Sequence, residues 1–237
     1  MKKRIWELDA FRGICGLGMV IVHLVYDLTE LYALVDWDVP DWFAFTQRWG
    51  GVLFLLISGI SATLGSRSVR RGIIVLCAGA LVSAVTYGMY TFAGFDKSII
   101  IYFGVLQCLG CCMILWWIFK RLPTWAMVVL GFCMVAAGLY LNTVVLLDQP
   151  LLMPLGFVYP GFASSDYFPL LPNLAYFLVG AVIGRRVYAR RQTRFSKINV
   201  QNPAIRFLTF LGRHSLPVYL LHQPALVLLI ALWQRIF

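Results

Sequence analysis

The sequence predicts an all-α protein, a polytopic membrane helical bundle of about seven transmembrane helices. Hydrophobic residues make up 61% of the chain and charged residues 13%, whereas soluble domains have about 45–50% and about 25%. The mean hydropathy is +0.81. A fold in water cannot bury this much apolar surface. The composition therefore excludes a soluble enzyme, a secreted disulfide-bonded domain and a disordered chain.

The predicted spans follow one another along the chain, and most approach the roughly 20 apolar residues that a helix needs to cross a bilayer. They run approximately over Phe11–Leu34, Val52–Leu64, Ile73–Phe92, Ile99–Phe119, Trp125–Leu147, Phe168–Val187 and Leu216–Ile236. The second is short, and we expect its helix to begin nearer Trp49. Pro123, Pro169 and Pro217 stand at the starts of the last three spans, where a helix tolerates proline. No repeat or soluble segment interrupts the series, so we expect one transmembrane domain over residues 1–237.

The distribution of Lys and Arg predicts the orientation. Seventeen of the 20 basic residues fall on one side of the predicted membrane, and the other three are Arg48, Lys97 and Arg235. Because cytoplasmic connections carry the excess of Lys and Arg, we expect the N-terminus in the cytoplasm and the C-terminus outside, in the cell (inner) membrane. The net charge of +10 then indicates contact with anionic lipids and anionic cytosolic ligands, and no nucleic acid is expected.

The cysteines are expected to be reduced and buried, because all of them fall in apolar runs. They are Cys15, Cys77, Cys108, Cys111, Cys112 and Cys133. Three of them, Cys108, Cys111 and Cys112, lie close together in the fourth predicted span. This segment has no second cysteine pair and no histidine, so we expect no metal site.

The first span is unusually polar for a membrane helix. An ionisable side chain at mid-helix costs about 2.5–3.5 kcal/mol on insertion scales, so such residues indicate function by default. His23 lies 11 residues after Arg12, roughly 16 Å deeper at about 1.5 Å per residue. Asp27 follows one turn later on the same face. His23 can be a base that Asp27 orients, the pair can serve a proton or solute pathway, or it can be a structural interhelical hydrogen bond.

Arg12 and Asp9 stand near the cytoplasmic end of the same span. An interfacial arginine often extends its charge to lipid phosphate, but it can also hold a phosphorylated ligand that enters from the cytosol. Asp9 can supply the counter-charge that orients Arg12. Because Glu7, Asp9 and Arg12 interrupt the apolar run that a signal peptide needs, we expect the first span to be retained.

Four further polar residues are candidates for substrate binding. His222, on the last span, lies at a depth similar to the middle of the first span, which predicts a cavity shared with His23. Gln107 can line a cavity or bridge two helices by a hydrogen bond. Asp166 and Tyr167, at the outer end of the sixth span, can contact an extracytoplasmic substrate, although an aromatic belt at the interface also explains Tyr167.

Several segments carry motifs that follow one another in a familiar order. They are RIWELDAFRGICGLGMVIVHLVYDL, FLLISGISATLGSRSVRRG, IYFGVLQCLG and DYFPLLPNLAYFLVGAVIGRRVY. Together they resemble the heparan-alpha-glucosaminide N-acetyltransferase-like family, from Arg4 to about Leu229. The ten residues between Arg12 and His23 are similar to the first-helix signature of the wider transmembrane acyltransferase superfamily, and LGRHSLPVYLLHQP is similar to the last helix of those proteins.

The resemblance implies an enzyme that moves an acyl group, typically acetyl, from cytosolic acyl-CoA to an extracytoplasmic hydroxyl or amine on a sugar or glycolipid. It implies that His23 is the catalytic histidine, that Arg12 acts on the acyl-CoA side, and that Asp9 is the acidic residue of the LDxxRG pattern. Acetyl-CoA or another acyl-CoA would be the co-substrate, without a metal. The partners would be membrane lipids, acyl-CoA and a glycan or glycolipid acceptor, and a homo-oligomer is compatible with the resemblance.

Two other functions compete with an acyltransferase. A transporter or exporter of a small amphipathic solute would have discontinuous helices and two pseudo-symmetric halves, and an odd number of dissimilar spans argues against it. A non-catalytic scaffold would use His23 and Asp27 only to hold helices together.

Overall fold

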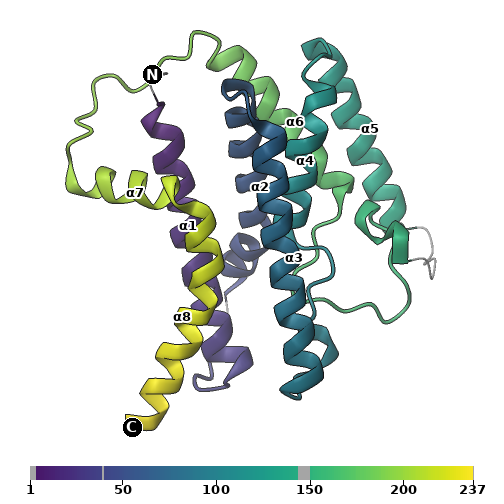
Figure 1. The fold of residues 1–237 in the computed structure, drawn as a ribbon, viewed down its shortest axis with the longest axis vertical. Helices are drawn as coiled ribbons and strands as arrows, with labels where there is room; N and C mark the ends of the chain where they lie inside the picture. Colours follow the sequence, from purple (N-terminus) through teal and green to yellow (C-terminus); the bar gives the residue numbers. More distant parts are fainter. Residues whose placement is uncertain (1–3, 39, 144–149, 237) are drawn as a thin grey trace. The chain divides into compact units, whose positions relative to one another are not determined.

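The structure is a computed structural model that describes residues 4–38, 40–143 and 150–236. These residues form helices and no strand (Figure 1). The helices are α1 (Trp6–Tyr26), α2 (Asp41–Leu64), α3 (Ser68–Phe92), α4 (Val105–Phe119), α5 (Thr124–Thr143), α6 (Leu170–Val187), α7 (Pro203–Arg213) and α8 (Ser215–Ile236). A π-helical turn, Asp27–Leu31, continues α1, and 3-10 turns cover Lys97–Ile99 and Pro150–Leu155.

The all-α, multi-pass architecture predicted from the sequence is confirmed. Within the described residues, 6 helices are long and apolar enough to cross a membrane, and α4 is a shorter apolar helix. The exposed side chains fit this assignment. On α1, Phe11, Ile14, Leu17 and Ile21 are all exposed, and their spacing of three or four residues forms one stripe. Such a stripe is a liability in water and is what a helix needs where lipid is the solvent.

Four predicted helix starts are wrong. α1 begins at Trp6, α2 at Asp41 and α3 at Ser68, all earlier than expected, because their polar first turns still form helix. α4 begins later, at Val105, because Phe103 is extended and its carbonyl accepts the N–H of Phe168 at 2.8 Å. The predicted end of the fifth span, near Leu147, falls among residues 144–149, outside the described residues.

Helix α7 was not predicted, because a search for 20-residue apolar runs passes over an 11-residue amphipathic helix. The stretch that contains it lies between the predicted spans Phe168–Val187 and Leu216–Ile236, where no helix was expected. Instead, the Asn202 side chain accepts the N–H of Ala204 at 2.9 Å and caps the helix, and Pro203 occupies the first turn. Both are standard features of a helix N-terminus.

The chain divides into two compact units, and the boundary falls inside α2. Unit 1 comprises Met1–Phe54 and Arg191–Phe237, and unit 2 comprises Leu55–Arg190. In unit 1, α1 packs against both α7 and α8 (Figure 1). One domain over residues 1–237 stays a prediction, because a division by contacts does not show whether the parts fold independently.

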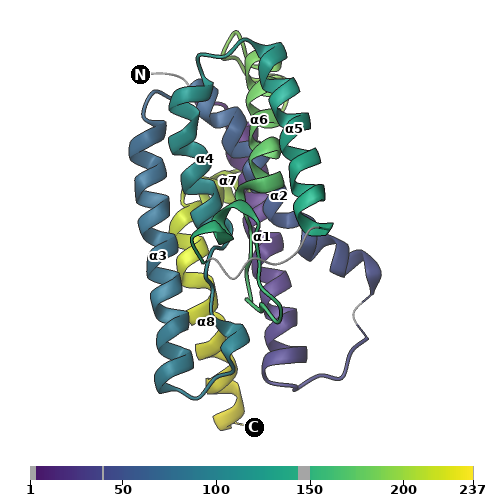
Figure 2. The same ribbon diagram turned by 90° about the vertical axis from the view of Figure 1, so that its right-hand side faces the viewer.

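Unit 2 is a bundle with an apolar core. Helix α3 packs along α4, and α5 along α6 (Figure 2). Phe177, Cys108, Cys112 and Met127 are fully buried at its centre. At Gly180, a Cβ atom would meet the backbone carbonyl of Leu56, so the absence of a side chain lets α2 and α6 approach closely.

Candidate active site

His23 lies in the last turns of α1 and offers one ring nitrogen as a base. Its Nδ1 is 2.9 Å from the carbonyl oxygen of Met19, one turn earlier. A carbonyl oxygen can only accept a hydrogen bond, so Nδ1 carries the proton. In the neutral ring, Nε2 therefore presents a lone pair that can accept a proton.

His222 on α8 repeats this arrangement. Its Nδ1 is 2.6 Å from the carbonyl oxygen of Tyr219, so Nδ1 is again the donor. Its Nε2 is buried and has no hydrogen-bond partner within the described part of the chain. The ring centroids of His23 and His222 are 4.7 Å apart, with an angle of 80° between the ring planes. The depth of the two residues was predictable, and the structure adds that their rings are in contact.

Asp27 is the first residue of the π-helical turn and is fully buried. Its Oδ1 accepts the amide N–H of Gln223 on α8 at 2.7 Å. The sequence predicts that Asp27 orients the His23 ring. In the structure, the Met19 carbonyl holds Nδ1 of that ring instead. Asp27 joins α1 to α8. π-helical turns inside helices occur frequently at functional sites.

Among the residues that the structure describes, three buried polar atoms between α1 and α8 have no hydrogen-bond partner: Oδ2 of Asp27, Nε2 of His222 and Oε1 of Gln223. Each is an acceptor in the arrangement described. An unpaired buried polar group costs about 1–3 kcal/mol, so native proteins retain such groups mainly where they have a function. A ligand that donates hydrogen bonds would satisfy them. Gln223 was missed as a site residue, because its position beside Asp27 depends on the packing of α8.

A charged cluster surrounds Asp9 near the start of α1. Its carboxylate lies 3.3 Å from Nη1 of Arg12, 3.4 Å from Nε of Arg213 and 4.0 Å from Nη1 of Arg4. The predicted pair of Asp9 and Arg12 is therefore present, and the other two arginines are additional. One carboxylate against three guanidinium groups leaves an excess of positive charge, which suits an anionic ligand.

The packing of α7 on α1 brings Arg213 to Asp9. A Cβ on Gly13 would meet the carbonyl of Leu208, and one on Gly212 would meet that of Asp9, so two glycines let the backbones nearly touch. Sequence reasoning missed Arg213 because this contact is tertiary. Arg4 was missed because it looked like one more cytoplasmic charge.

Buried Glu7 fixes the segment before α7 to the first turn of α1. Its two carboxylate oxygens accept the hydroxyl of Thr193 at 2.8 Å and the backbone N–H of Arg194 at 2.8 Å. Both contacts lie within unit 1. They hold the segment that leads into α7 against the start of α1, close to Asp9.

The remaining predicted site residues belong to unit 2. The Gln107 side chain accepts the N–H of Gly104 at 3.0 Å and donates to the Gly79 carbonyl at 3.0 Å and the Ser83 hydroxyl at 2.7 Å. It therefore links α3 to the start of α4. Substrate binding by Gln107 stays a prediction.

Asp166 and Tyr167 also make structural contacts. Oδ2 of Asp166 accepts the N–H of Val105 at 2.9 Å, at the start of α4. The Tyr167 hydroxyl donates to the Met153 carbonyl at 2.8 Å, and burial raises the pKa of this phenol to about 12. A substrate-binding role for either residue stays a prediction.

The fold and this site define a multi-pass membrane protein with a buried polar centre beneath a basic cluster. No group of three His, Cys, Asp or Glu side chains that could hold a metal ion occurs among residues 4–38, 40–143 and 150–236.

Residues 4–224 match the family described as heparan-alpha-glucosaminide N-acetyltransferase, catalytic. The match includes His23, Asp27, His222 and Gln223, and the chain belongs to this family of membrane acetyltransferases. The family expected from the motifs is thus confirmed. No curated protein and no solved structure matches the chain significantly.

Proposed function

We propose that the protein transfers an acetyl or other acyl group from cytosolic acyl-CoA to a hydroxyl or amine on the other side of the membrane. The acceptor would be a sugar or a glycolipid. Family membership supports the acetyltransferase class. Within unit 1, the basic residues lie at one end of α1 and the buried hydrogen-bond acceptors near the other. This arrangement supports a site for acyl-CoA at the basic end and a reaction centre at the histidines.

The donor end is the cluster around Asp9. Arg4, Arg12 and Arg213 would hold the phosphates of acyl-CoA, because guanidinium groups bind phosphate with directed hydrogen bonds. From Arg12 to His23 the helix advances 11 residues, roughly 16 Å at about 1.5 Å per residue. An extended arm such as the pantetheine of CoA can bridge this interval, so the phosphates can stay at the basic end while the thioester approaches the histidines.

The reaction centre is formed by His23, His222 and Asp27. Acyl-CoA would supply the acyl group as a thioester. As the acceptor oxygen or nitrogen attacks the thioester carbon, Nε2 of His23 takes its proton, the new C–O or C–N bond forms, and the C–S bond breaks. The departing thiolate then takes up this proton from Nε2, which returns His23 to its neutral form. The carboxylate of Asp27 would stabilise the imidazolium that forms.

The observation that carries the proposal is the contact of two imidazoles that both present Nε2 as an acceptor, beside buried acceptors without partners. A purely structural polar contact between helices would pair its buried atoms. A transporter would need a path for the solute and has no requirement for two basic ring nitrogens in contact.

The test measures turnover of acetyl-CoA by the purified protein in nanodiscs, with the release of free CoA as the signal. Mass spectrometry of whole-cell lipid and glycan extracts would identify the acetylated product. We expect CoA release that depends on added extract, together with a product heavier by one acetyl group. Absence of acetyl-CoA binding and turnover would contradict the proposal, and solute uptake into vesicles without acetyl transfer would support the transporter.

A further inference from the structure

The segment from Arg191 to Leu211 combines exposed basic and exposed apolar side chains and has no part in the proposed reaction. It holds no Asp or Glu. Its four cations are Arg191, Arg194, Lys197 and Arg206, all of them exposed. Its large exposed hydrophobic residues are Phe195, Ile198, Val200, Phe207 and Phe210. Soluble surfaces rarely gather so many of both kinds.

Helix α7 has two different faces. Thr209 and Gly212 are buried, and Leu208 contacts Gly13 of α1. The opposite face carries Phe207 and Phe210, which are 54% and 57% exposed. The first face is used for packing within unit 1, so the second is available to a partner outside this unit.

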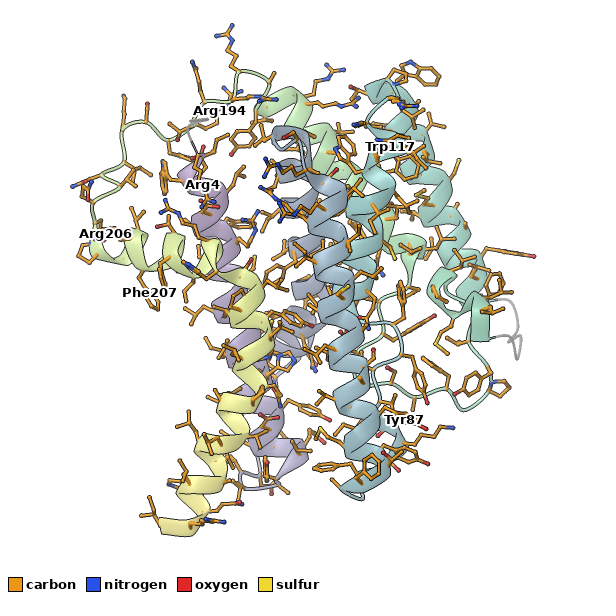
Figure 3. The ribbon with its side chains drawn as sticks, viewed as in Figure 1. Arg4, Tyr87, Trp117, Arg194, Arg206 and Phe207 are labelled. Carbon is orange, nitrogen blue, oxygen red and sulfur yellow. The ribbon has the colours of Figure 1, made fainter. Side chains whose placement is uncertain are left out.

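The direction of these side chains fits a membrane surface. Within unit 1, α7 runs across the direction of α1 and α8 (Figure 1). Phe207 extends from α7 in the direction in which α8 runs, whereas Arg4 and Arg194 lie beyond the other side of α7 (Figure 3). Since α1 and α8 are long enough to span a bilayer, Phe207 points toward the hydrocarbon and the arginines toward water.

We infer that residues 191–211 form an interfacial segment that binds anionic phospholipid. Phe207 and Phe210 insert among the acyl chains, as the apolar face of an interfacial helix does to a depth of about 5–10 Å. Arg191, Lys197 and Arg206 contact the headgroup phosphates. The absence of acidic residues removes any repulsion of the lipid charge.

A phospholipid fits this surface better than a soluble phosphate compound does. A soluble ligand would pair with the cations but would leave the two phenyl rings in water. A lipid leaflet offers an anionic layer next to an apolar layer, in the order in which Arg194 and Phe207 lie on the two sides of α7 (Figure 3). The inference uses neither the histidines nor the acyl transfer and stands apart from the proposed function.

The test compares lipid binding by the full-length protein and three matched variants. The first variant, R191Q/K197Q/R206Q, removes three cations of the segment. The second, F207S/F210S, removes the rings. The control, R67Q/R70Q/R71Q, removes three exposed cations at the start of α3. Native mass spectrometry would measure affinity for phosphatidylglycerol and phosphatidylcholine, and thermal unfolding would confirm that each variant is folded.

We expect the unmodified protein to bind phosphatidylglycerol about tenfold or more tightly than phosphatidylcholine, since each interfacial cation adds to the attraction. The first variant should lose this preference, the second should bind both lipids more weakly, and the control should behave as the unmodified protein. Equal affinity for both lipids would overturn the inference. So would an unchanged F207S/F210S variant, which would indicate a soluble phosphate ligand, or equal losses in the control.

Hydrogen exchange provides a second measurement that does not depend on a variant. In nanodiscs of phosphatidylcholine with about one third phosphatidylglycerol, residues 191–211 should exchange more slowly than in phosphatidylcholine alone. Equal protection in both nanodiscs would overturn the inference. That result would indicate that another protein surface, such as a second copy of the chain, covers the rings.

Discussion

The proton positions at the candidate active site follow from carbonyl groups of the same helices. Met19 holds Nδ1 of His23, and Tyr219 holds Nδ1 of His222. Each carbonyl lies within one turn of its histidine, so the orientation of each ring is a local property. The contact between the rings is a tertiary property, because it requires α8 to pack on α1.

Replacement of His23 tests its role as a base. For His23→Ala we expect kcat for acetyl transfer to fall by about 100- to 10,000-fold, the usual contribution of general base catalysis. KM for acetyl-CoA should change little, because the phosphate-binding arginines remain. Steady-state kinetics of the purified variant measure both values.

His214 provides the matched control for this replacement. It is exposed, and its Nδ1 lies 2.9 Å from the carbonyl of Phe210, so it shares the local geometry without the burial. His214→Ala should keep nearly full activity. Similar losses in both variants would mean that the effect of His23→Ala is not specific to the buried ring.

Gln223 is expected to stabilise the charge of Asp27. In Gln223→Leu, both carboxylate oxygens would lack a partner, because Gln223 is the donor to Oδ1. Removing one partner of a buried polar pair costs about 1–3 kcal/mol. We expect a lower unfolding temperature in detergent. Gln192→Leu, at an exposed position, should leave it unchanged, and an equal decrease in both would refute the role of the pair.

The Tyr167 hydroxyl should lose its proton at a higher pH than an ordinary tyrosine does. Burial raises its pKa to about 12, above the ordinary value of about 10, so the folded state favours the protonated phenol. This contribution to stability is complete below about pH 10 and is lost as the pH rises toward about 12. The ultraviolet difference titration between the unmodified protein and Tyr167→Phe should show this late phenolate. A difference centred near the ordinary value would contradict the prediction.

The crossing of α1 and α7 is the element-level contact that builds the basic cluster. In Gly13→Ala the new methyl group would meet the backbone carbonyl of Leu208, which cannot move as a side chain can. Overpacking of this kind costs about 1–3 kcal/mol. We expect a lower unfolding temperature and weaker acetyl-CoA binding, because α7 carries Arg213 to Asp9.

Gly18 of the same helix is the control for this substitution. A Cβ there would meet no atom of the described residues within 4 Å, and alanine favours helix over glycine by about 1 kcal/mol. Gly18→Ala should therefore be neutral or stabilising. A loss of stability as large as that of Gly13→Ala would show that the crossing is not the cause.

The sequence predicted well the existence of those helices that form because their residues are apolar over a long run. Long runs such as Ser68–Phe92 need only lipid on most sides, so their existence can be read from hydropathy. The start of α4 depends on the extended pairing of Phe103 with residues after α5, and α7 depends on packing against Gly13. Neither is visible in composition.

The candidate site was predictable only in part for the same reason. His23, His222 and Asp27 stand out because an ionisable residue inside a span is costly. The partner of each depends on which helices meet. Thus Gln223 and Arg213 were missed, and the orienting role expected of Asp27 belongs to the Met19 carbonyl.

At the scale of the whole molecule, the basic residues predict the orientation. Seventeen of the 20 Lys and Arg residues lie on the predicted cytoplasmic side. We expect a fluorescent protein fused to the N-terminus to fold in the cytoplasm, and a phosphatase fused to the C-terminus to be active outside. The opposite pattern would reverse the donor and acceptor sides of the proposed reaction.

The most direct measurement uses sealed vesicles that contain the purified protein in one orientation, with acetyl-CoA supplied only on the side of the N-terminus. We predict that acetylated acceptor accumulates on the opposite side in proportion to the CoA released. His23→Ala should slow both by about 100- to 10,000-fold, whereas His214→Ala should not. Product on the side of acetyl-CoA, or undiminished CoA release by His23→Ala, would contradict transfer at a buried histidine reached from both faces of the membrane.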